Sequence, residues 1–187
     1  CSNCNATGKN FYFQKIIIPT YENGNLVYFQ ARDFTGGSFR YMNPKLGKTQ
    51  VVYFYDLLKE DDRIFITEGP FDAMTLFDYS STCIMGNVIS EPQVLKILRK
   101  KPKEIIFVPD FDPDEETRVK IINTMMKNIK KFRTLSDNKL TIGVFRWNKL
   151  SQKKDINEAG LTTVDDKYIS YITKFKDEVE MKLSNEI

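Results

Sequence analysis

The stretch R-I-F-I-T-E-G-P-F-D-A, residues 63–73, decides the fold of this chain. Its first five residues form a short apolar run typical of a buried strand, and Pro70 stands where the first turn of a helix tolerates proline. Further apolar runs follow at 82–85, 104–108 and 140–145, and helical stretches separate them at 70–79, 90–100 and 114–133. Strands that alternate with helices predict an α/β fold with a mostly parallel, Rossmann-like four-stranded sheet and flanking helices.

The chain before residue 61 has a different pattern. Residues 11–18 and 26–31 are aromatic and β-branched, and E-N-G-N at 22–25 separates them, which predicts a β-hairpin. Residues 33–48 are typical of loops, and a further strand is expected near 50–55. We therefore expect a small β-rich subdomain ahead of the α/β sheet.

The last segment has apolar residues at helical spacing, which predicts a C-terminal helix. The residues on its apolar face are Val164, Tyr168, Ile169, Ile172, Phe175, Val179 and Leu183.

Composition narrows the class of protein. The chain has 187 residues, of which 41% are apolar, and a net charge of +3. No apolar run approaches the ~18 residues that cross a bilayer, and no signal-peptide pattern opens the chain, so we expect a cytoplasmic protein without a membrane partner. Three cysteines do not make a disulfide framework. The first residue is Cys1 rather than methionine, so we expect a fragment.

Acidic residues follow the predicted strands. They are Glu68 and Asp72 after 63–67, Asp110 and Asp112 after 104–108, and Asp155 about ten residues beyond 140–145. Ligands of open α/β sheets bind outside the carboxyl ends of the strands, so Glu68, Asp110 and Asp112 should meet there. Alternation along an extended chain would point Asp110 and Asp112 the same way.

The type of these side chains indicates the metal. An all-oxygen site in a chain without histidine favours Mg²⁺ or Mn²⁺ over zinc. Two such ions can activate a hydroxyl and stabilise a leaving phosphate oxygen, which is phosphoryl-transfer chemistry. Any single acid after a strand is more often a helix cap or a solvated loop residue, and Asp114 fits that description. The coincidence of three acidic motifs beside strand ends is what favours a metal site.

These motifs resemble a known family. E-G-P-F-D-A, P-D-F-D and K-D-I-N-E look, in order, like the three motifs of the TOPRIM domain, over residues 62–160. The resemblance implies catalytic and metal-binding roles for Glu68, Asp110 and Asp112, with Asp72 and Asp155 completing the site. The third motif departs from the family's usual acidic pair, so the assignment of Asp155 is supported by fewer matching residues than the other assignments.

The segment before the α/β part also carries a resemblance. K-I-I-I-P-T-Y-E-N-G-N-L-V-Y-F-Q-A-R-D-F followed by F-R-Y-M-N-P is similar to the N-terminal subdomain of DnaG-type and phage DNA primases. It implies that Arg32, Arg40, Tyr41 and Asn43 contact nucleic acid or nucleotide; most relatives have Lys in place of Arg40. The segment from Lys9 to Lys48 contains six basic residues and only two acids, which suits a surface that binds the template backbone and the triphosphate.

Cys1 and Cys4 form a C-x-x-C that could supply two zinc ligands. Primases of this type carry a zinc ribbon upstream, and this pair looks like its last knuckle. A tetrahedral site needs four ligands, so Zn²⁺ is expected only in a longer protein and not ordered here.

The resemblance as a whole implies the RNA-polymerase core of a primase. Such an enzyme makes RNA primers on single-stranded DNA from ribonucleoside triphosphates with Mg²⁺ or Mn²⁺, beside a replicative helicase. The expected divisions are 1–10 (zinc knuckle), 11–61 (basic subdomain), 62–160 (TOPRIM) and 161–187 (C-terminal helix). The alternatives are a TOPRIM nuclease, or a RecR-like DNA-binding adaptor that is not an enzyme. The F-R-Y-M-N-P segment argues against the adaptor.

Overall fold

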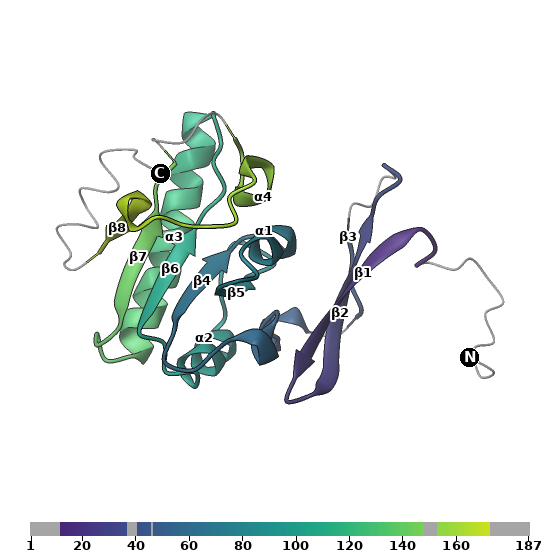
Figure 1. Ribbon diagram of the computed structural model, residues 1–187, viewed down its shortest axis with the longest axis horizontal. Helices are drawn as coiled ribbons and strands as arrows, with labels where there is room; N and C mark the ends of the chain where they lie inside the picture. Colours follow the sequence, from purple (N-terminus) through teal and green to yellow (C-terminus); the bar gives the residue numbers. More distant parts are fainter. Residues whose placement is uncertain (1–11, 37–40, 46, 148–152, 173–187) are drawn as a thin grey trace.

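A computed structural model of the chain describes residues 12–36, 41–45, 47–147 and 153–172 (Figure 1). Two sheets, one of three strands and one of five, organise these residues. The predictions for Cys1, Cys4 and Arg40 lie outside the described residues.

The larger sheet confirms the α/β class. Its strand order is β5-β4-β6-β7-β8, with β4 paired in parallel to β5 and β6, and β6 in parallel to β7. The strands are β4 (Arg63–Thr67), β5 (Ser80–Cys83), β6 (Glu104–Val108), β7 (Thr141–Phe145) and β8 (Ile169–Tyr171). The four parallel strands lie at or near the four predicted runs, and β8 is an additional antiparallel edge strand.

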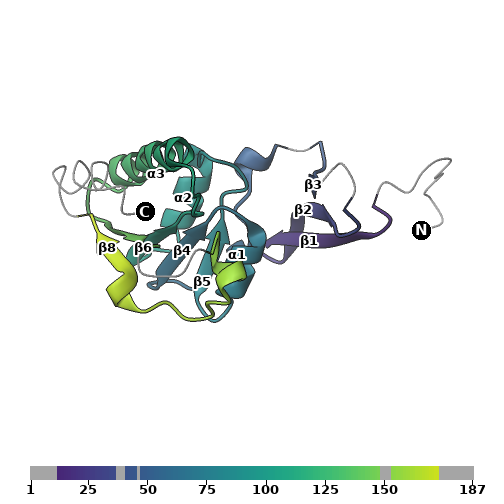
Figure 2. The ribbon, with the colours of Figure 1, turned by 90° about the horizontal axis from the view of Figure 1, so that it is seen from above.

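Helices cover both faces of this sheet. They are α1 (Pro70–Thr75), α2 (Glu91–Leu98), α3 (Glu115–Leu135) and α4 (Ile156–Ala159), with the 3₁₀ turns η1 (Lys48–Gln50), η2 (Tyr55–Leu57) and η3 (Asp166–Tyr168). Figure 2 shows α2 and α3 together on one face. Helix α2 begins at a capping box, in which the Gln93 amide donates to Ser90 Oγ and the Ser90 amide donates to Gln93 Oε1.

Strand β4 is buried on both sides, as is typical of a parallel strand. Ile64 and Ile66 belong to the apolar cluster beneath α2 and α3. Phe65 belongs to the cluster on the opposite face, with Leu76 and Ile156. The sheet therefore stands between two apolar layers, which fix the positions of its strand ends.

The predicted C-terminal helix is wrong over the described residues 161–172, which contain η3 and β8 instead. Strand β8 pairs with β7 through Gly143 and Tyr171, Val144 and Ser170, and Phe145 and Ile169. A Cβ atom at Gly143 would lie 2.6 Å from Ile169 Cγ2, so the absence of a side chain at this position leaves room for β8 beside β7. Pairing to the open edge of β7 overrides the helical spacing. The remainder of that prediction, residues 173–187, lies outside the described residues.

The predicted strand near 50–55 is also wrong. These residues lie between and within the turns η1 and η2. Side chains, rather than a neighbouring strand, satisfy the backbone here: the Val52 amide donates to Glu22 Oε1, and the carbonyl of Val51 accepts from Gln93 Nε2.

The predicted hairpin is confirmed. Strands β1 (Lys15–Glu22) and β2 (Asn25–Asp33) are antiparallel, and the short β3 (Tyr41–Met42) pairs with β2. The turn residues Asn23 and Gly24 have φ of 53° and 75°, and asparagine followed by glycine is the pair that favours such a turn.

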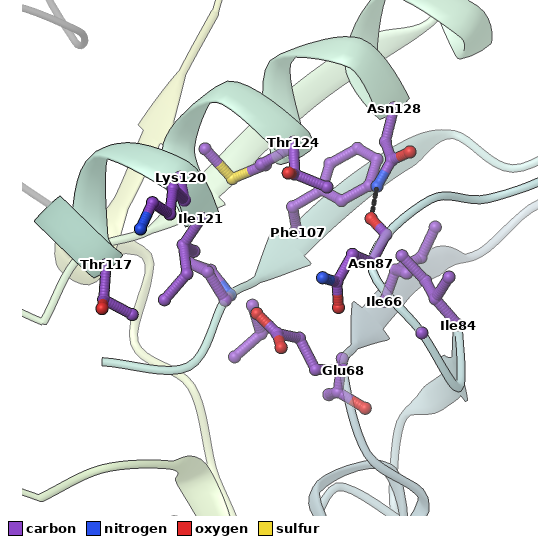
Figure 3. A pocket seen from close by; sticks show the side chains of 15 residues that line it. Ile66, Glu68, Ile84, Asn87, Phe107, Thr117, Lys120, Ile121, Thr124 and Asn128 are labelled. Atoms are coloured by element: carbon purple, nitrogen blue, oxygen red, sulfur yellow. Dashed lines mark hydrogen bonds between the residues drawn. The ribbon is translucent and has the colours of Figure 1, made fainter. Parts of the chain in front are cut away.

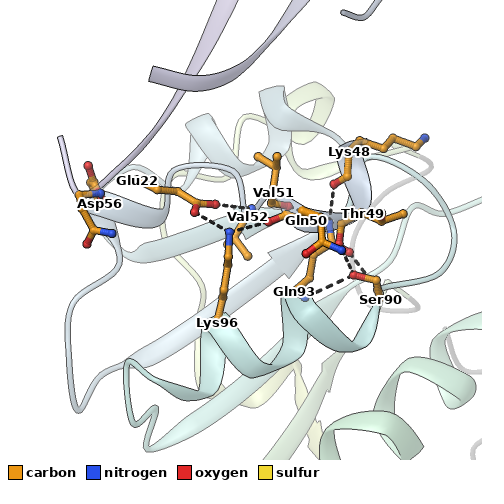
Figure 4. A network of polar contacts seen from close by, with 11 residues as sticks. Glu22, Lys48, Thr49, Gln50, Val51, Val52, Asp56, Ser90, Gln93 and Lys96 are labelled. Atoms are coloured by element: carbon orange, nitrogen blue, oxygen red, sulfur yellow. Dashed lines mark hydrogen bonds and ion pairs between the residues drawn. The ribbon is translucent and has the colours of Figure 1, made fainter. Parts of the chain in front are cut away.

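Polar contacts attach this hairpin to the rest of the chain (Figure 4). The Asp56 carboxylate accepts from the amides of Asn23 and Gly24, at 2.7 and 2.8 Å. Glu22 forms an ion pair of 2.5 Å with Lys96 of α2, in addition to its bond from Val52. The tip of the hairpin is thus held to the 48–57 segment and to α2, which sets where the other end of the small sheet stands.

Within the described ranges, no helix combines the length and apolarity that crossing a bilayer would require.

Candidate functional site

A cleft of about 820 Å³ lies between the small sheet and the carboxyl end of the large one. Four of the five predicted carboxylates line it: Glu68, Asp72, Asp110 and Asp155. The opposite wall includes Arg32 and Tyr41 of the small sheet. The other lining residues are Ile16, Asp33, Phe34, Gly36, Gly69, Phe71, Lys154 and Asn157.

Parallel pairing brings Glu68 and Asp110 together. Thr67 of β4 is paired with Val108 of β6, so the residues that follow these strands leave the sheet side by side. The Asp110 amide donates a hydrogen bond to Glu68 Oε1 at 3.3 Å. This contact agrees with the expectation that Glu68 and Asp110 lie close together at the strand ends.

Asp72 and Asp155 come from elements that pack on each other, α1 and α4. Asp72 lies in the first turn of α1 and is buried, and its Oδ1 accepts from the Asn157 amide at 3.3 Å. Asp155 caps α4 by accepting from the Glu158 amide at 2.7 Å. The Phe111 amide donates to the carbonyl of Lys154 at 2.6 Å, which places the third motif beside the second.

The structure does not bring Asp112 into this cleft. Its Oδ1 accepts from the Asp114 amide at 2.9 Å, at the approach to α3. The expected alternation of Asp110 and Asp112 requires an extended backbone, but β6 ends at Val108 and the residues after it are not a strand. Among the described residues, no three acidic or cysteine side chains are grouped closely enough to hold one metal ion as they stand.

Burial and mutual repulsion raise pKa values among the cleft carboxylates. Burial raises the pKa of Glu68. Burial and repulsion from Asp155 raise the pKa of Asp72 to about 6. Burial and the charges of Glu68, Asp72 and Asp155 raise the pKa of Asp110 to about 7, although Lys154 opposes this shift. Acids that cluster in a buried place favour protonation or a cation among them.

The basic wall is built around Arg32. Its guanidinium donates to the Tyr41 hydroxyl and lies over the Tyr41 ring, 4.6 Å from the centroid. It also lies 5.2 Å from the ring centroid of Phe71, in α1. Arg32 therefore spans from the small sheet to the E-G-P-F-D-A motif, and the aromatic rings hold its orientation.

Asn43 does not line the cleft; its Oδ1 accepts from Gln30 Nε2 at 3.1 Å. The lining residues that sequence reasoning missed include Phe71, Lys154 and Asn157. All three lie inside the quoted motifs or next to them, so motif membership was a signal that could have found them.

The family model of the Toprim domain matches residues 63–140. These residues have the Toprim fold. Asp155 and α4 lie beyond the matched residues, and the cleft joins them to the Toprim domain. Among curated proteins, none matches the chain.

Solved structures with the same fold include primases. The DnaG primase catalytic domain bound to ssDNA matches with a TM-score of 0.61 and 14% identity, over 93% of this chain and 52% of that one. A DNA primase domain from Pseudomonas aeruginosa matches with a TM-score of 0.60 and 18% identity, over 97% and 55%.

A third match is to a chain of the bacteriophage T7 lagging-strand DNA polymerase assembly, which contains primase domains of two gp4 subunits bound to an RNA/DNA hybrid and dTTP. It has a TM-score of 0.51 and 19% identity, over 76% of this chain and 68% of that one.

These likenesses confirm the resemblance to a DnaG-type core: a Toprim domain preceded by a small β-rich sheet. Because the identities are low, they show the fold alone. The chain spans about half the length of the DnaG structures it matches.

Proposed function

We propose that this chain is the catalytic core of a DNA primase, which synthesises RNA primers on single-stranded DNA from ribonucleoside triphosphates. The observation that carries the proposal is the cleft, because it sets the Toprim carboxylates opposite Arg32 and Tyr41 of a second sheet. A polymerase needs both walls. Acidic side chains hold cations at the reacting phosphates, and a positively charged side chain holds the substrate's own phosphates.

The donor set of the cleft fits divalent cations. Its acids offer only oxygen ligands, which suit Mg²⁺ or Mn²⁺. Burial and the charges of neighbouring acids raise the pKa values of Asp72 and Asp110, and a bound cation would offset both effects. Glu68, Asp72, Asp110 and Asp155 would hold the metal, and Asp112 remains a proposed ligand on the strength of the resemblance. Bound there, Mg²⁺ or Mn²⁺ would neutralise charge on the reacting phosphates.

The proposed reaction is attack by a nucleotide 3′-hydroxyl on the α-phosphate of an incoming triphosphate, with release of pyrophosphate. Arg32 would orient a phosphate of the template or of the triphosphate, because its side chain lines the cleft together with the acids. Tyr41 and Phe71 keep the guanidinium of Arg32 facing the cleft. Arg40 and Asn43 are further proposed contacts from the same segment.

Two further proposals concern parts beyond the cleft. Cys1 and Cys4 would contribute to a Zn²⁺ site only together with ligands from a longer protein. A replicative helicase, fused or separate, is the proposed partner, with the host cytoplasm as the place of action if a phage encodes the chain.

Incorporation of labelled ribonucleotides on single-stranded DNA, with Mn²⁺ or Mg²⁺, tests the proposal. We expect template-dependent RNA from the wild type and a loss of about 100-fold or more for Glu68→Gln and Asp110→Asn. Asp114→Asn is the matched control, because Asp114 caps α3 outside the cleft and asparagine can still cap. Equal products from all four proteins would overturn the assigned roles.

The same assay separates the alternatives. A Toprim nuclease would cleave DNA or RNA with no triphosphate added, and its activity would survive Arg32→Ala better than primer synthesis would. A RecR-like adaptor would bind DNA equally well with and without Glu68→Gln and Asp110→Asn and would make no product.

A further inference from the structure

A second cavity, of about 230 Å³, also borders Glu68 (Figure 3). Strand ends of β4 and β6 form its floor, the first half of α3 forms one wall, and the 84–87 loop forms the other. Glu68 lines both this cavity and the cleft. We call it the switch-point pocket.

The topology of the sheet explains its position. The chain leaves β4 through α1 and leaves β6 through α3, and these two connections lie on opposite faces of the sheet. Leu76, just after α1, packs with Phe65, whereas Ile129 of α3 packs with Ile64 on the other face. When the helices that follow two adjacent parallel strands lie on opposite faces of the sheet, a crevice forms at the carboxyl ends of those strands. Open α/β sheets bind their ligands in this crevice.

The wall of the pocket is pre-formed. Asn128 of α3 is buried, its Nδ2 donates to the carbonyl of Asn87 at 3.1 Å, and its Oδ1 accepts from the Ile89 amide at 3.0 Å. Lys131 also donates to the carbonyl of Ile89. These bonds fasten the 84–89 loop to α3, so the cavity does not depend on a ligand to hold it open.

The lining is suited to a flat ring with polar edges. Ile66, Ile84, Phe107 and Ile121 give apolar surfaces, while Asn87, Thr117, Thr124 and Glu68 give hydrogen-bonding groups around them (Figure 3). Drug-sized ligands occupy pockets of about 300–1,000 Å³, so a cavity somewhat smaller than this suits one ring system.

We propose that the switch-point pocket binds the base of a nucleoside. The apolar surfaces contact the ring faces, and Glu68, Asn87 and the two threonines contact the ring's polar edge. This site does not depend on primer synthesis, because it is made by the sheet and α3 and includes neither Arg32 nor Asp110. Since Glu68 is shared, an occupied pocket changes the surroundings of the cleft.

Methyl NMR of isoleucine-labelled protein, titrated in EDTA with adenosine, guanosine and uridine, tests the proposal. Nucleosides carry no phosphate and therefore probe the pocket without the metal site. We expect saturable shifts at Ile66, Ile84 and Ile121, with a Kd of about 0.1–1 mM for at least one nucleoside. Ile16 lines the cleft but not the pocket, so its methyl should move much less.

Two variants on α3 complete the experiment. Thr124→Phe fills the pocket and should weaken binding at least tenfold, whereas Val119→Phe changes an exposed residue of the same helix and should leave binding unchanged. No saturable shift in the wild type, or shifts confined to Ile16, would overturn the proposal. Binding retained by Asp110→Asn, which should be inactive in primer synthesis, separates this proposal from the proposed function.

Discussion

The amide of Asp110 donates to the Glu68 carboxylate at 3.3 Å, which joins the loops that follow two adjacent parallel strands. This contact places two half-buried acids side by side with few compensating cations. The charge balance of that pair and the attachment of the small sheet opposite it lead to three predictions, and the pairing of β8 with β7 leads to a fourth.

Metal-free protein should lose stability as the pH rises. The folded-state pKa of Asp110 is raised from 3.8 to about 7, so the folded protein binds a proton that the unfolded chain releases between these values. Stability therefore falls as the pH rises through this window. The Tm should drop by a few degrees, roughly 3–8 °C, between pH 5 and pH 8, and Asp110→Asn should flatten this slope in thermal melts. Asp114→Asn should not flatten it, because the pKa of Asp114 is lowered. A wild-type Tm that rises over this range would contradict the prediction.

Mn²⁺ should reverse that loss. A cation that binds the folded state alone stabilises it by mass action, and it binds more tightly when the acids are ionised. The increase in Tm on adding Mn²⁺ should be larger at pH 8 than at pH 5, and Glu68→Gln with Asp110→Asn should abolish it. An equal increase at both pH values would count against cation binding at these acids.

Breaking the Glu22–Lys96 ion pair should loosen the small sheet. The pair is largely buried, and Glu22 also accepts from Val52, so Glu22→Gln should cost about 1–3 kcal/mol of unfolding free energy. Hydrogen exchange should increase in β1 and β2 more than in β6. Lys101→Met, an exposed lysine just beyond α2, is the control and should change neither quantity. Exchange that increases equally in both sheets would mean that the pair stabilises the whole fold without specifically fastening the hairpin.

Gly143→Ala should destabilise the protein by about 1–3 kcal/mol, measured by denaturant unfolding. A Cβ atom there meets Ile169 Cγ2 at 2.6 Å and Ile106 Cδ1 at 2.8 Å, so β8 must shift away from β7. Gly47→Ala is a matched control, because its nearest neighbour is a threonine oxygen at 3.9 Å. A neutral Gly143→Ala would show that β8 does not pair with β7 as described.

Local pattern was enough to predict much of this fold. The apolar runs at 63–67 and 104–108, the Asn23-Gly24 turn and the Ser90 cap each depend on residues a few positions apart, and each is present in the structure. The meeting of Glu68 and Asp110 also followed, because parallel neighbours must end at the same edge.

Other features depend on parts of the chain that are distant in sequence. Residues 169–171 have helical spacing, yet they become a strand because β7 offers an unpaired edge. Asp112 has the expected spacing from Asp110, but its carboxylate is directed to the Asp114 amide by the turn into α3.

The sequence by itself determined the alternation of strands and helices, the hairpin and the acids at the strand ends, since periodicity and turn chemistry act over a few residues. Only the tertiary structure decided that Arg32 stands over Phe71 across the cleft, that Lys154 adjoins the second motif, and that Glu68 borders a second pocket. Each of these is set by packing between segments that meet only after the chain has folded, and no local spacing encodes such a meeting.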